Sequence, residues 1–432
     1  MINQLAIILF WVLAILAAIQ LLFLGQFLLS LRQYLASAAS PAVPYTPKAA
    51  IVLCLRGADP FLPNCIKALT QQDYPDYELH IIIDSLEDPA WSIVSQAIGN
   101  LKQIPITVQT LESPRSTCSL KCSALIQALS RLDSDCEVVA LVDSDTVPAS
   151  TWLQELVAPL ADSRVGLTTG NRWYAPSGNQ WGSIIRYLWN STAIVSMYVF
   201  KTPWGGTLAV RTDFLRQANL LEEWNRTLCE DVPLHLALQK QKLEIKFVPS
   251  LVMVNYEECN LPSFMRWASR QLLLTRLYHP DWNWMLGFSL IASVLPILAL
   301  ILLITLQVGS QLGLPTDAET SQQVVIWLSS GLVIFYLLGL GAGLWLIDRA
   351  IRLLMHSTAQ PLPTFSPNAL LKIILGIPLS QVLTLLLMLS ATFARHTEWR
   401  GITYTIKAPH DIHLVEYRPY RLAKLLSSKA SL

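Results

Sequence analysis

Charged residues are scarce in this sequence. Only 14% of its 432 residues are charged, against roughly 25% in an average soluble domain. The 31 Lys and Arg nearly balance the 30 Asp and Glu, which leaves a formal net charge of +1. Such a chain has no general electrostatic attraction for nucleic acid, so we expect no nucleic-acid partner. Because 53% of the residues are hydrophobic, the composition predicts a membrane protein.

Cysteine is also sparse, and its spacing excludes the common frameworks. The seven cysteines are odd in number and irregularly spaced. Cys118 and Cys122 form a C-x3-C pair without clustered histidines, which is not the usual spacing of a structural zinc site. We therefore expect reduced cysteines in a cytoplasmic compartment.

Long apolar runs lie at both ends of the chain. Residues 5–31 contain no charge, and about 20 apolar residues suffice for a spanning helix. No basic residue precedes this run and Arg32 follows it, which indicates an anchor whose N-terminus faces outward rather than a secretory signal. Residues 285–308 and 324–347 can also span. The connector between them carries Asp317 and Glu319 but no Lys or Arg, which suits the outer side.

The last apolar run, residues 370–393, is interrupted by polar residues and by proline: Lys372, Pro378, Ser380 and Gln381. If this run crossed the membrane, the basic tail after it would lie outside, against the positive-inside rule. We therefore expect a broken, re-entrant or interfacial segment. The predicted parts are an anchor (1–35), a cytoplasmic domain (36–282), C-terminal membrane helices (283–394) and a basic cytoplasmic tail (395–432).

The region between the membrane runs has an α/β pattern. Residues 49–55 and 78–83 are apolar runs of strand length, and a helical stretch, residues 63–72, separates them. Strand, helix and strand with short links predict a parallel sheet of Rossmann-like type. Ligands of such sheets bind at the carboxyl ends of the strands. Polar residues and a glycine stand there: Arg56, Gly57, Asp84 and Asp88. Each could instead be a turn or cap residue.

The strongest local signal is VVALVDSDTVP at residues 138–148. An apolar strand leads directly into Asp143 and Asp145, and alternation along a strand aims both carboxylates to one side. Two carboxylates at a strand end can hold Mg²⁺ or Mn²⁺, which in turn neutralises a diphosphate. A D-x-D taken alone is also common by chance.

Three further segments carry candidate residues. Lys121 opens a helical stretch, residues 119–132, where a cation opposes the helix dipole. It can bind a phosphate or be a solvated lysine. Gly205 and Gly206 either let the backbone approach a ligand closely or belong to an ordinary loop. The same two interpretations apply to the glycines of residues 166–173. Glu230 and Asp231 precede another helical stretch, where Asp231 is either an N-cap or a general base.

A helical stretch at residues 264–276 lies just before the second membrane run. It contains Arg266 and Trp267. Its cations either face lipid headgroups, as on a surface helix, or Arg266 binds a donor diphosphate while Trp267 lies near the acceptor.

With these motifs in place, the chain resembles the family 2-like glycosyltransferases, specifically the ceramide glucosyltransferase group. The closest stretch is residues 55–90, LRGADPFLPNCIKALTQQDYPDYELHIIIDSLEDPA. The resemblance implies a GT-A nucleotide-sugar domain. It also implies that Asp88 contacts the nucleotide, that Asp143 with Asp145 holds a metal–diphosphate, and that Asp231 is the base.

Two other motifs carry the resemblance less closely. The family's Q/R-x-x-R-W reads here as residues 263–267, SFMRW, with Ser263 in the first position. Arg270 or Gln271, one turn on, can take over the missing contact. Trp399-Arg400-Gly401, followed by Tyr404, is similar to the family's C-terminal W-R-x-G-x-Y motif, which lies beside the active site.

The expected reaction is an inverting transfer of a hexose from a UDP-sugar to a lipid hydroxyl at the cytoplasmic face; glucose is what the resemblance implies. The expected acceptor pocket contains Gly205, Gly206, Glu230 and Trp267. The alternatives are a processive polysaccharide synthase of the same fold, which needs more spanning helices, and an inactive membrane scaffold.

Overall fold

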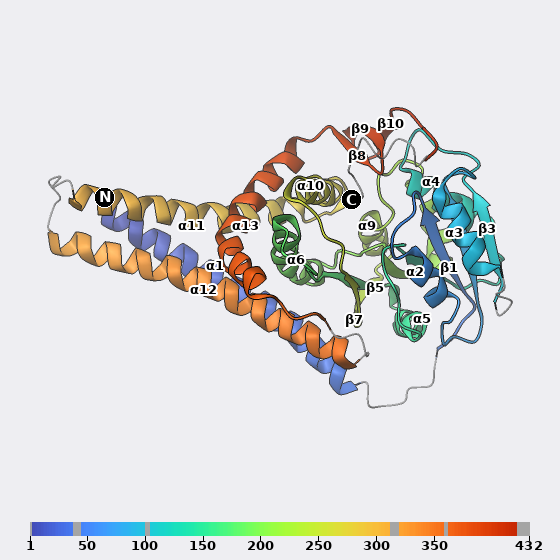
Figure 1. Ribbon diagram of the computed structural model, residues 1–432, viewed down its shortest axis with the longest axis horizontal. Helices are drawn as coiled ribbons and strands as arrows, with labels where there is room; N and C mark the ends of the chain where they lie inside the picture. The colour runs from blue at the N-terminus through green and yellow to red at the C-terminus, as the bar shows by residue number, and fades with distance from the viewer. Residues whose placement is uncertain (1, 38–44, 100–103, 312–318, 358–361, 421–432) are drawn as a thin grey trace.

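The computed structural model describes residues 2–37, 45–99, 104–311, 319–357 and 362–420. Figure 1 shows two parts, an α/β domain and a group of long helices that extends from one side of it. The predicted fold class, an α/β domain combined with long apolar helices, is confirmed.

The domain is built on a seven-stranded sheet of order β3-β2-β1-β4-β6-β5-β7. Its strands are β1 (Ala49–Leu55), β2 (Tyr77–Ile83), β3 (Ile106–Thr110), β4 (Val138–Val142), β5 (Val165–Tyr174), β6 (Thr207–Arg211) and β7 (Glu244–Asn255). The first four strands are parallel to one another, whereas β6 is antiparallel to both β4 and β5. Every residue of β4 is buried, as expected for a strand covered on both faces.

Helices cover both faces of the sheet. They are α2 (Leu62–Leu69), α3 (Pro89–Ile98), α4 (Leu120–Leu129), α5 (Trp152–Val157), a 3-10 turn (Ala158–Ala161), α6 (Trp181–Val199), α7 (Thr212–Gln217), α8 (Leu220–Trp224), α9 (Pro233–Lys240) and α10 (Leu261–Tyr278). Alternate residues of β1 pack on opposite faces: Val52 lies in the cluster with α4, α8 and α9, and Leu53 lies in the cluster with α2, α3 and α5.

The strand register gathers the site residues at one edge of the sheet. Leu55 pairs with Ile83, and Leu53 pairs with Val142. The residues that follow β1, β2 and β4 therefore lie side by side. Because β6 is antiparallel to β4, its starting end lies at this same edge, as do the carboxyl ends of β5 and β7. Five strands and the loop before β6 thus supply side chains to one place.

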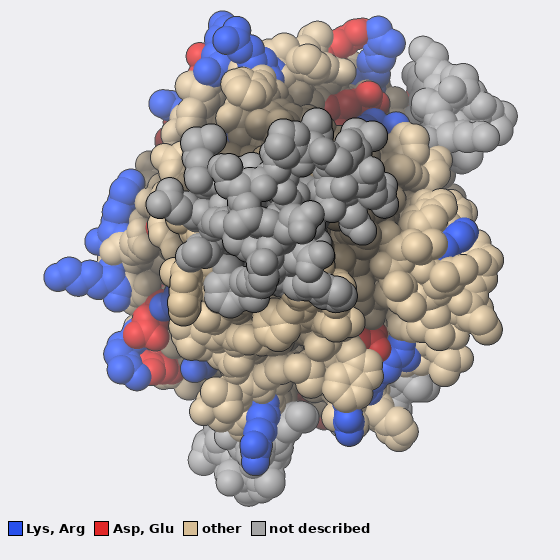
Figure 2. Space-filling view, turned by 90° about the vertical axis from the view of Figure 1, so that its left-hand side faces the viewer, with Lys and Arg blue, Asp and Glu red and all other residues tan. Residues whose placement is uncertain are grey.

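The long helices are α1 (Ile2–Ser37), α11 (Trp282–Gln311), α12 (Glu319–Ser357) and α13 (Pro367–Phe393). All four contain a stretch that is long and apolar enough to cross a membrane. In Figure 1, α1, α11 and α12 run together away from the domain, whereas α13 runs steeply across the end of this bundle nearest the domain. Viewed along the bundle, Lys and Arg side chains lie around the rim of the molecule (Figure 2).

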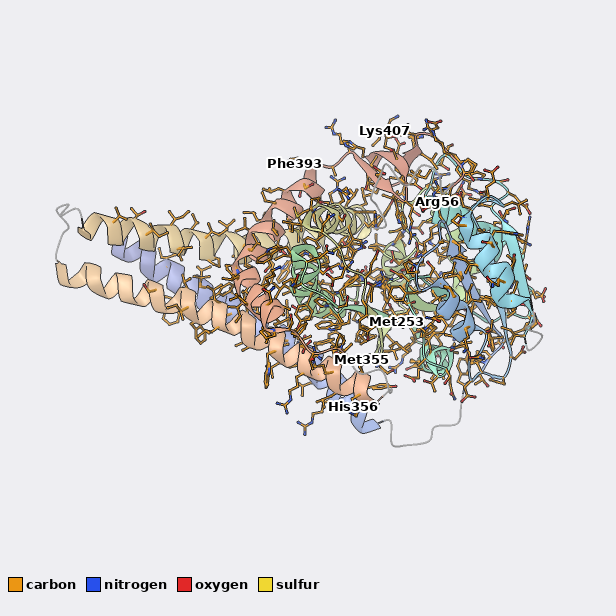
Figure 3. All side chains as sticks on the ribbon, viewed as in Figure 1. Arg56, Met253, Met355, His356, Phe393 and Lys407 are labelled. Carbon is orange, nitrogen blue, oxygen red and sulfur yellow. The ribbon has the colours of Figure 1, made fainter. Side chains whose placement is uncertain are left out.

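Both halves of α13 contact the α/β domain. Near its start, Lys372 Nζ donates to the Asn179 carbonyl at 2.7 Å. Near its end, Arg276 of α10 donates to the Ala394 carbonyl at 2.8 Å. Figure 3 accordingly labels Phe393, the last residue of α13, beside the domain. Pro378 lies inside the helix without ending it, so of the three alternatives expected for this run, a broken segment is not what the structure contains.

A small antiparallel sheet, which the sequence patterns did not predict, follows α13. It consists of β8 (His396–Trp399), β9 (Ile402–Ala408) and β10 (Asp411–Leu414) in the order β10-β9-β8. The sheet packs on the α4 side of the domain, where the Tyr404 hydroxyl accepts a hydrogen bond from Leu120 N at 3.2 Å. Residues 396–414 are therefore part of the domain's core.

Candidate active site

A cavity of about 390 Å³ runs from the carboxyl edge of the sheet to the long helices. At the sheet its lining is polar and charged, and includes Arg56, Asp84, Lys121, Asp143, Asp145 and Asp231. Towards the helices the lining becomes apolar and aromatic, and includes Trp189, Met197, Trp282, Met285, Phe288 and Met388. One continuous space thus joins the predicted polar centre to α11 and α13.

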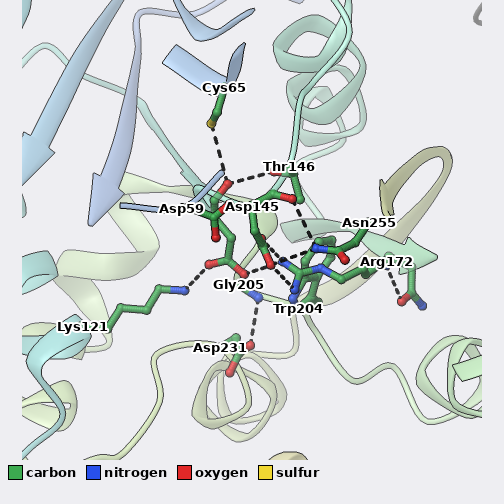
Figure 4. Close-up of polar contacts among 12 residues, drawn as sticks. Asp59, Cys65, Lys121, Asp145, Thr146, Arg172, Trp204, Gly205, Asp231 and Asn255 are labelled. Atoms are coloured by element: carbon green, nitrogen blue, oxygen red, sulfur yellow. Dashed lines mark hydrogen bonds and ion pairs between the residues drawn. The ribbon is translucent and has the colours of Figure 1, made fainter. Parts of the chain in front are cut away.

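The two carboxylates of the D-x-D converge on one arginine, Arg172, which Figure 4 shows beside Asp145. Arg172 Nη2 lies 2.6 Å from Asp145 Oδ1 and 2.9 Å from Asp143 Oδ2. Arg172 Nη1 lies 2.8 Å from Asp145 Oδ2. Residues 143–145 form a turn directly after β4, and Arg172 comes from the end of β5. The structure therefore brings Asp143 and Asp145 together, but it does so through this turn, because the strand ends at Val142 and its alternation does not continue.

Lys121 bridges Asp143 and Glu230. Its Nζ lies 2.8 Å from Asp143 Oδ1 and 2.7 Å from Glu230 Oε1. Although burial opposes the charge, these carboxylates raise the pKa of Lys121. They also explain why a cation is tolerated at the start of α4 against the helix dipole. Burial, only partly offset by Lys121, raises the pKa of Glu230 to about 7.

Burial and the neighbouring charges move the pKa values of the D-x-D pair apart. Burial opposes ionisation of Asp143, but Lys121 and Arg172 together hold its pKa well below the usual range. Burial raises the pKa of Asp145, and Arg172 only partly counteracts it. Titration of the pair is thus governed by the two cations and by burial.

Asp231 is held by backbone N–H groups. Its Oδ2 accepts from Gly205 N at 2.8 Å and its Oδ1 accepts from Val232 N at 2.7 Å. The side chain is half-buried and lines the cavity. The alternative reading as an N-cap of α9 does not hold, since Val232 is in the cap position.

The two glycines before β6 are needed by the acidic side chains themselves. A Cβ on Gly205 would lie 1.9 Å from Glu230 Oε1, and one on Gly206 would lie 2.1 Å from the Trp204 ring and 2.6 Å from Asp143 Oδ2. Both residues line the cavity. Absence of a side chain at these positions therefore lets the carboxylates pack against the loop.

Arg56 and Asp84 form a buried ion pair at the end of β1 and β2, with 2.6 Å between Arg56 Nη1 and Asp84 Oδ2. The C-terminal tail covers this pair. Arg56 donates to the carbonyl of Arg400 at 3.0 Å, and Asp84 Oδ2 accepts from Tyr420 N at 2.9 Å. Gly57 has φ +83°, and a Cβ there would lie 2.7 Å from the Tyr420 ring.

Asp88 has a structural role in this edge. It caps α3 by accepting from Ala90 N at 2.9 Å, and it also accepts from Gly57 N at 2.8 Å. Asp88 is buried and does not line the cavity. Burial raises its pKa. The structure thus supports the cap reading of Asp88, which holds the Gly57 turn in place.

The helix α10 turns different residues to the cavity from those expected. Trp267 is buried, lines the cavity and packs edge-on against Tyr174 and Trp189, with ring centroids 5.2 and 5.4 Å away. Arg266 is exposed and donates to Ser263 Oγ at 3.0 Å. One turn on, Arg270 is buried and lines the cavity. The structure therefore does not bring Arg266 to the carboxylates, whereas it brings Arg270 to the cavity.

The carboxylate pair has the chemistry of a divalent-cation site. Asp143 Oδ2 and Asp145 Oδ1 point at a single position, which Arg172 Nη2 holds. Oxygen ligands are what Mg²⁺ and Mn²⁺ prefer, and such ions commonly use two carboxylates with water and phosphate oxygens. Within the described ranges, no cluster of three or more His, Cys, Asp or Glu could hold a metal by protein ligands alone. The residues fit a metal that binds together with a phosphate ligand.

The family profile described as glycosyl transferase family 21 matches residues 9–412. The chain belongs to glycosyl transferase family 21. It is therefore a glycosyltransferase, and the expectation of an enzyme is confirmed.

Two solved structures illustrate what this family 21 enzyme is similar to. One is a mannosyltransferase from Pyrobaculum calidifontis in complex with GDP-mannose and Mn²⁺, 14% identical, with a TM-score of 0.42, covering 88% of this chain and 99% of that one. The other is glucosyl-3-phosphoglycerate synthase from Mycobacterium tuberculosis in complex with Mn²⁺, UDP-glucose and glycerol 3-phosphate. It is 15% identical, has a TM-score of 0.33, and the match covers 55% of this chain and 80% of that one.

Two functional candidates in this family 21 enzyme escaped the sequence patterns. Arg172 and Trp204 flank the carboxylate pair, with the guanidinium 4.6 Å from the Trp204 ring. Both lie in segments that the sequence marks only by glycines beside aromatics. In the structure Arg172 stands near the end of β5, whose other residues are buried, but the glycines of this strand hide that position in the sequence.

A pair of buried histidines connects α9, which follows Asp231, to the base of α11. The rings of His235 and His279 lie 4.7 Å apart. His279 Nδ1 accepts from Asp281 N at 3.1 Å, and its Nε2 lies 3.0 Å from the Phe200 carbonyl, so the neutral ring satisfies both contacts. Burial, followed by repulsion from His235, lowers the pKa of His279 to about 4.

Proposed function

We propose that this family 21 enzyme transfers a hexose, glucose in the first instance, from a UDP-sugar to the hydroxyl group of a membrane lipid with inversion at the anomeric carbon. The observation that carries this proposal is the single cavity that is charged at the sheet and apolar at α11 and α13. A nucleotide sugar suits the first end and a lipid suits the second.

The donor belongs at the carboxyl edge of the sheet. Arg56, Asp84 and the tail residue Tyr404 line the part of the cavity at the ends of β1 and β2, which we assign to the nucleoside. Lys121 and Arg270 lie further along the cavity and supply positive charge for the diphosphate. Mg²⁺ or Mn²⁺ bound at Asp143 and Asp145 would stabilise the negative charge of the leaving nucleoside diphosphate.

The acceptor belongs at the apolar end. The lining residues Trp282, Met285 and Phe288 come from α11, and Met388 comes from α13. Both helices are apolar enough to lie in a membrane. An acyl chain can bury its surface against these side chains, which favours a lipid over a growing polysaccharide because a polymer of sugars needs a polar channel. Trp267 then lies between the two ends.

Asp231 is the residue we assign as the base. It takes the proton of the lipid hydroxyl as the oxygen forms a bond to the anomeric carbon. The bond from that carbon to the β-phosphate oxygen breaks, and its electron pair leaves with UDP. The two backbone N–H groups fix the Asp231 carboxylate, which favours it over Glu230, since Glu230 is buried and paired with Lys121.

We place the catalytic domain on the cytoplasmic face of the membrane. Arg32 follows the first apolar run, and Arg349 and Arg352 follow the third, in keeping with the positive-inside rule. Helix α13 then lies at the membrane interface, because contacts near both of its ends hold it against the domain. On this arrangement the tail also lies in the cytoplasm, beside the donor.

The test is turnover by the full chain in detergent, with UDP-glucose, a mixed lipid extract and Mg²⁺ or Mn²⁺. We compare the wild type with Asp231→Asn, and use Asp213→Asn as the control because Asp213 is an exposed partner of Arg211. Loss of a general base costs typically 10²–10⁴-fold in rate, so Asp231→Asn should lose turnover and keep UDP binding. Wild-type turnover in the Asp231 variant would refute its role; a glucose polymer instead of a glycolipid would refute the lipid acceptor.

A further inference from the structure

Arg172 occupies the position at which the two D-x-D carboxylates meet. Its guanidinium makes a two-pronged contact with Asp145, at 2.6 and 2.8 Å, and a third contact with Asp143 at 2.9 Å. Such forked, charge-assisted contacts are the strongest hydrogen bonds that carboxylates make. A divalent cation that used both carboxylates would need the same position.

The surroundings of Arg172 keep its guanidinium in this place. It lies 4.6 Å from the Trp204 ring, and its Nη1 also lies 3.1 Å from the Tyr174 hydroxyl. Its side chain is only 11% exposed. The buried Nε has no hydrogen-bond partner in the described part of the chain, so one N–H of the guanidinium would gain an acceptor if the side chain moved to meet a phosphate oxygen.

Charge balance explains what this arrangement does to a metal. Arg172 contacts both Asp143 and Asp145, and Lys121, which is shared with Glu230, also contacts Asp143. Without a donor, a divalent cation gains little from a pair whose negative charge these two cations already largely offset. Arrival of a diphosphate adds negative charge and acceptors that suit a planar guanidinium.

We propose that Arg172 is a positioning residue that closes the Asp143–Asp145 pair to divalent cations until a nucleoside diphosphate arrives. The diphosphate draws the guanidinium away from the carboxylates, and the freed oxygens then accept the metal. Metal and donor consequently bind with positive coupling, and each raises the affinity of the other by the same factor. This inference rests on the proposed function of the site.

The experiment measures Mn²⁺ binding rather than turnover. Electron paramagnetic resonance of free Mn²⁺ gives the affinity for the full chain in detergent, with and without UDP. The variants are Arg172→Met, Arg172→Lys and, as the control, Arg164→Met, since Arg164 is an exposed arginine paired with Asp162. Thermal unfolding shows that each variant is folded.

For the wild type we expect weak Mn²⁺ binding that UDP tightens. Removal of the forked contacts should raise the Mn²⁺ affinity of Arg172→Met without UDP by roughly 10- to 100-fold, the range expected for charge-assisted hydrogen bonds. UDP should then add little. Arg172→Lys keeps the charge but not the fork, so it should lie between the two, and Arg164→Met should match the wild type.

Three results would decide against the inference. If folded Arg172→Met binds Mn²⁺ no more tightly than the wild type without UDP, Arg172 does not close the pair. If UDP binds but Mn²⁺ binds to neither the wild type nor Arg172→Met, the Asp143–Asp145 pair is not a metal site. The proposed glycosyl transfer is not refuted by that result. If UDP itself does not bind, the donor site of the proposed function is wrong.

Discussion

Replacing Arg270 by Met should make this enzyme more stable and, at the same time, a poorer binder of its donor. Arg270 is only 7% exposed. Burial, followed by repulsion from Arg400, lowers the pKa of Arg270 from 12.5 to about 10. That difference corresponds to roughly 3 kcal/mol by which the folded state disfavours the cation.

The net gain is smaller because Arg270 also stacks on Trp399, with 5.3 Å between the guanidinium carbon and the ring centroid. Losing such a contact costs about 1 kcal/mol, and Met keeps most of the side chain's packing volume. We therefore expect Arg270→Met to raise the free energy of unfolding by on the order of 2 kcal/mol. A diphosphate that contacts the charged guanidinium in the wild type should lose roughly 1.5–3 kcal/mol of binding free energy in the variant. This loss corresponds to an affinity about 10- to 100-fold lower.

The assay combines thermal unfolding in detergent with calorimetric titration of UDP. Arg266→Met is the matched control, because Arg266 lies one turn earlier in α10 and is exposed. It should change neither the melting temperature nor UDP binding. The reasoning fails if Arg270→Met binds UDP like the wild type, or if it is Arg266→Met that loses the nucleotide.

Other substitutions test other contacts. Gly205→Ala places a Cβ where Glu230 Oε1 lies, 1.9 Å away, so kcat should fall by about a hundredfold, whereas Gly287→Ala, with no atom nearby, should leave it unchanged. Burial keeps His279 neutral in the folded protein, so its contribution to stability is present above its ordinary pKa of 6.5 and is lost as the pH falls towards about 4. The free energy of unfolding should therefore drop by about 2 kcal/mol between pH 7 and pH 5. His279→Gln should abolish this part of the pH dependence. Tyr404→Phe leaves the N–H at the start of α4 unsatisfied, and should cost about 1–3 kcal/mol in thermal or chemical unfolding; an unchanged midpoint would show that water replaces the hydroxyl.

Continuous apolar runs made part of the fold predictable. Residues 49–55 and 138–142 coincide with β1 and β4, since a strand buried on both faces consists almost wholly of apolar residues. The D-x-D then follows β4 in the chain, so its place at the sheet edge follows from the strand itself. Residues 166–173 hide a strand because Gly166 and Gly170 interrupt its pattern. A Cβ on Gly170 would lie 2.1 Å from the Leu251 carbonyl oxygen, a requirement set by a distant segment.

The arginines of α10 show how much depends on helix phase. Arg266 and Arg270 are one turn apart, yet the first is exposed and the second is buried, and a motif centred on Arg266-Trp267 does not distinguish them. The tail sheet did carry a signal, because Ile402, Tyr404 and Ile406 alternate with exposed residues. Its partner, the face of α4, lies far away in sequence and could not be inferred from that alternation.

The tail sheet has a consequence for biosynthesis. Cys54 and Tyr404 line the same cavity but are 350 positions apart, the difference between 404 and 54. At about 5–20 residues per second, the ribosome adds Tyr404 roughly 20–70 seconds after Cys54. By then α11, α12 and α13 have already been made. On the arrangement proposed above, a nascent chain thus carries its acidic residues through membrane insertion before the cavity is complete, and it can hold a sugar donor only once its long helices have been synthesised.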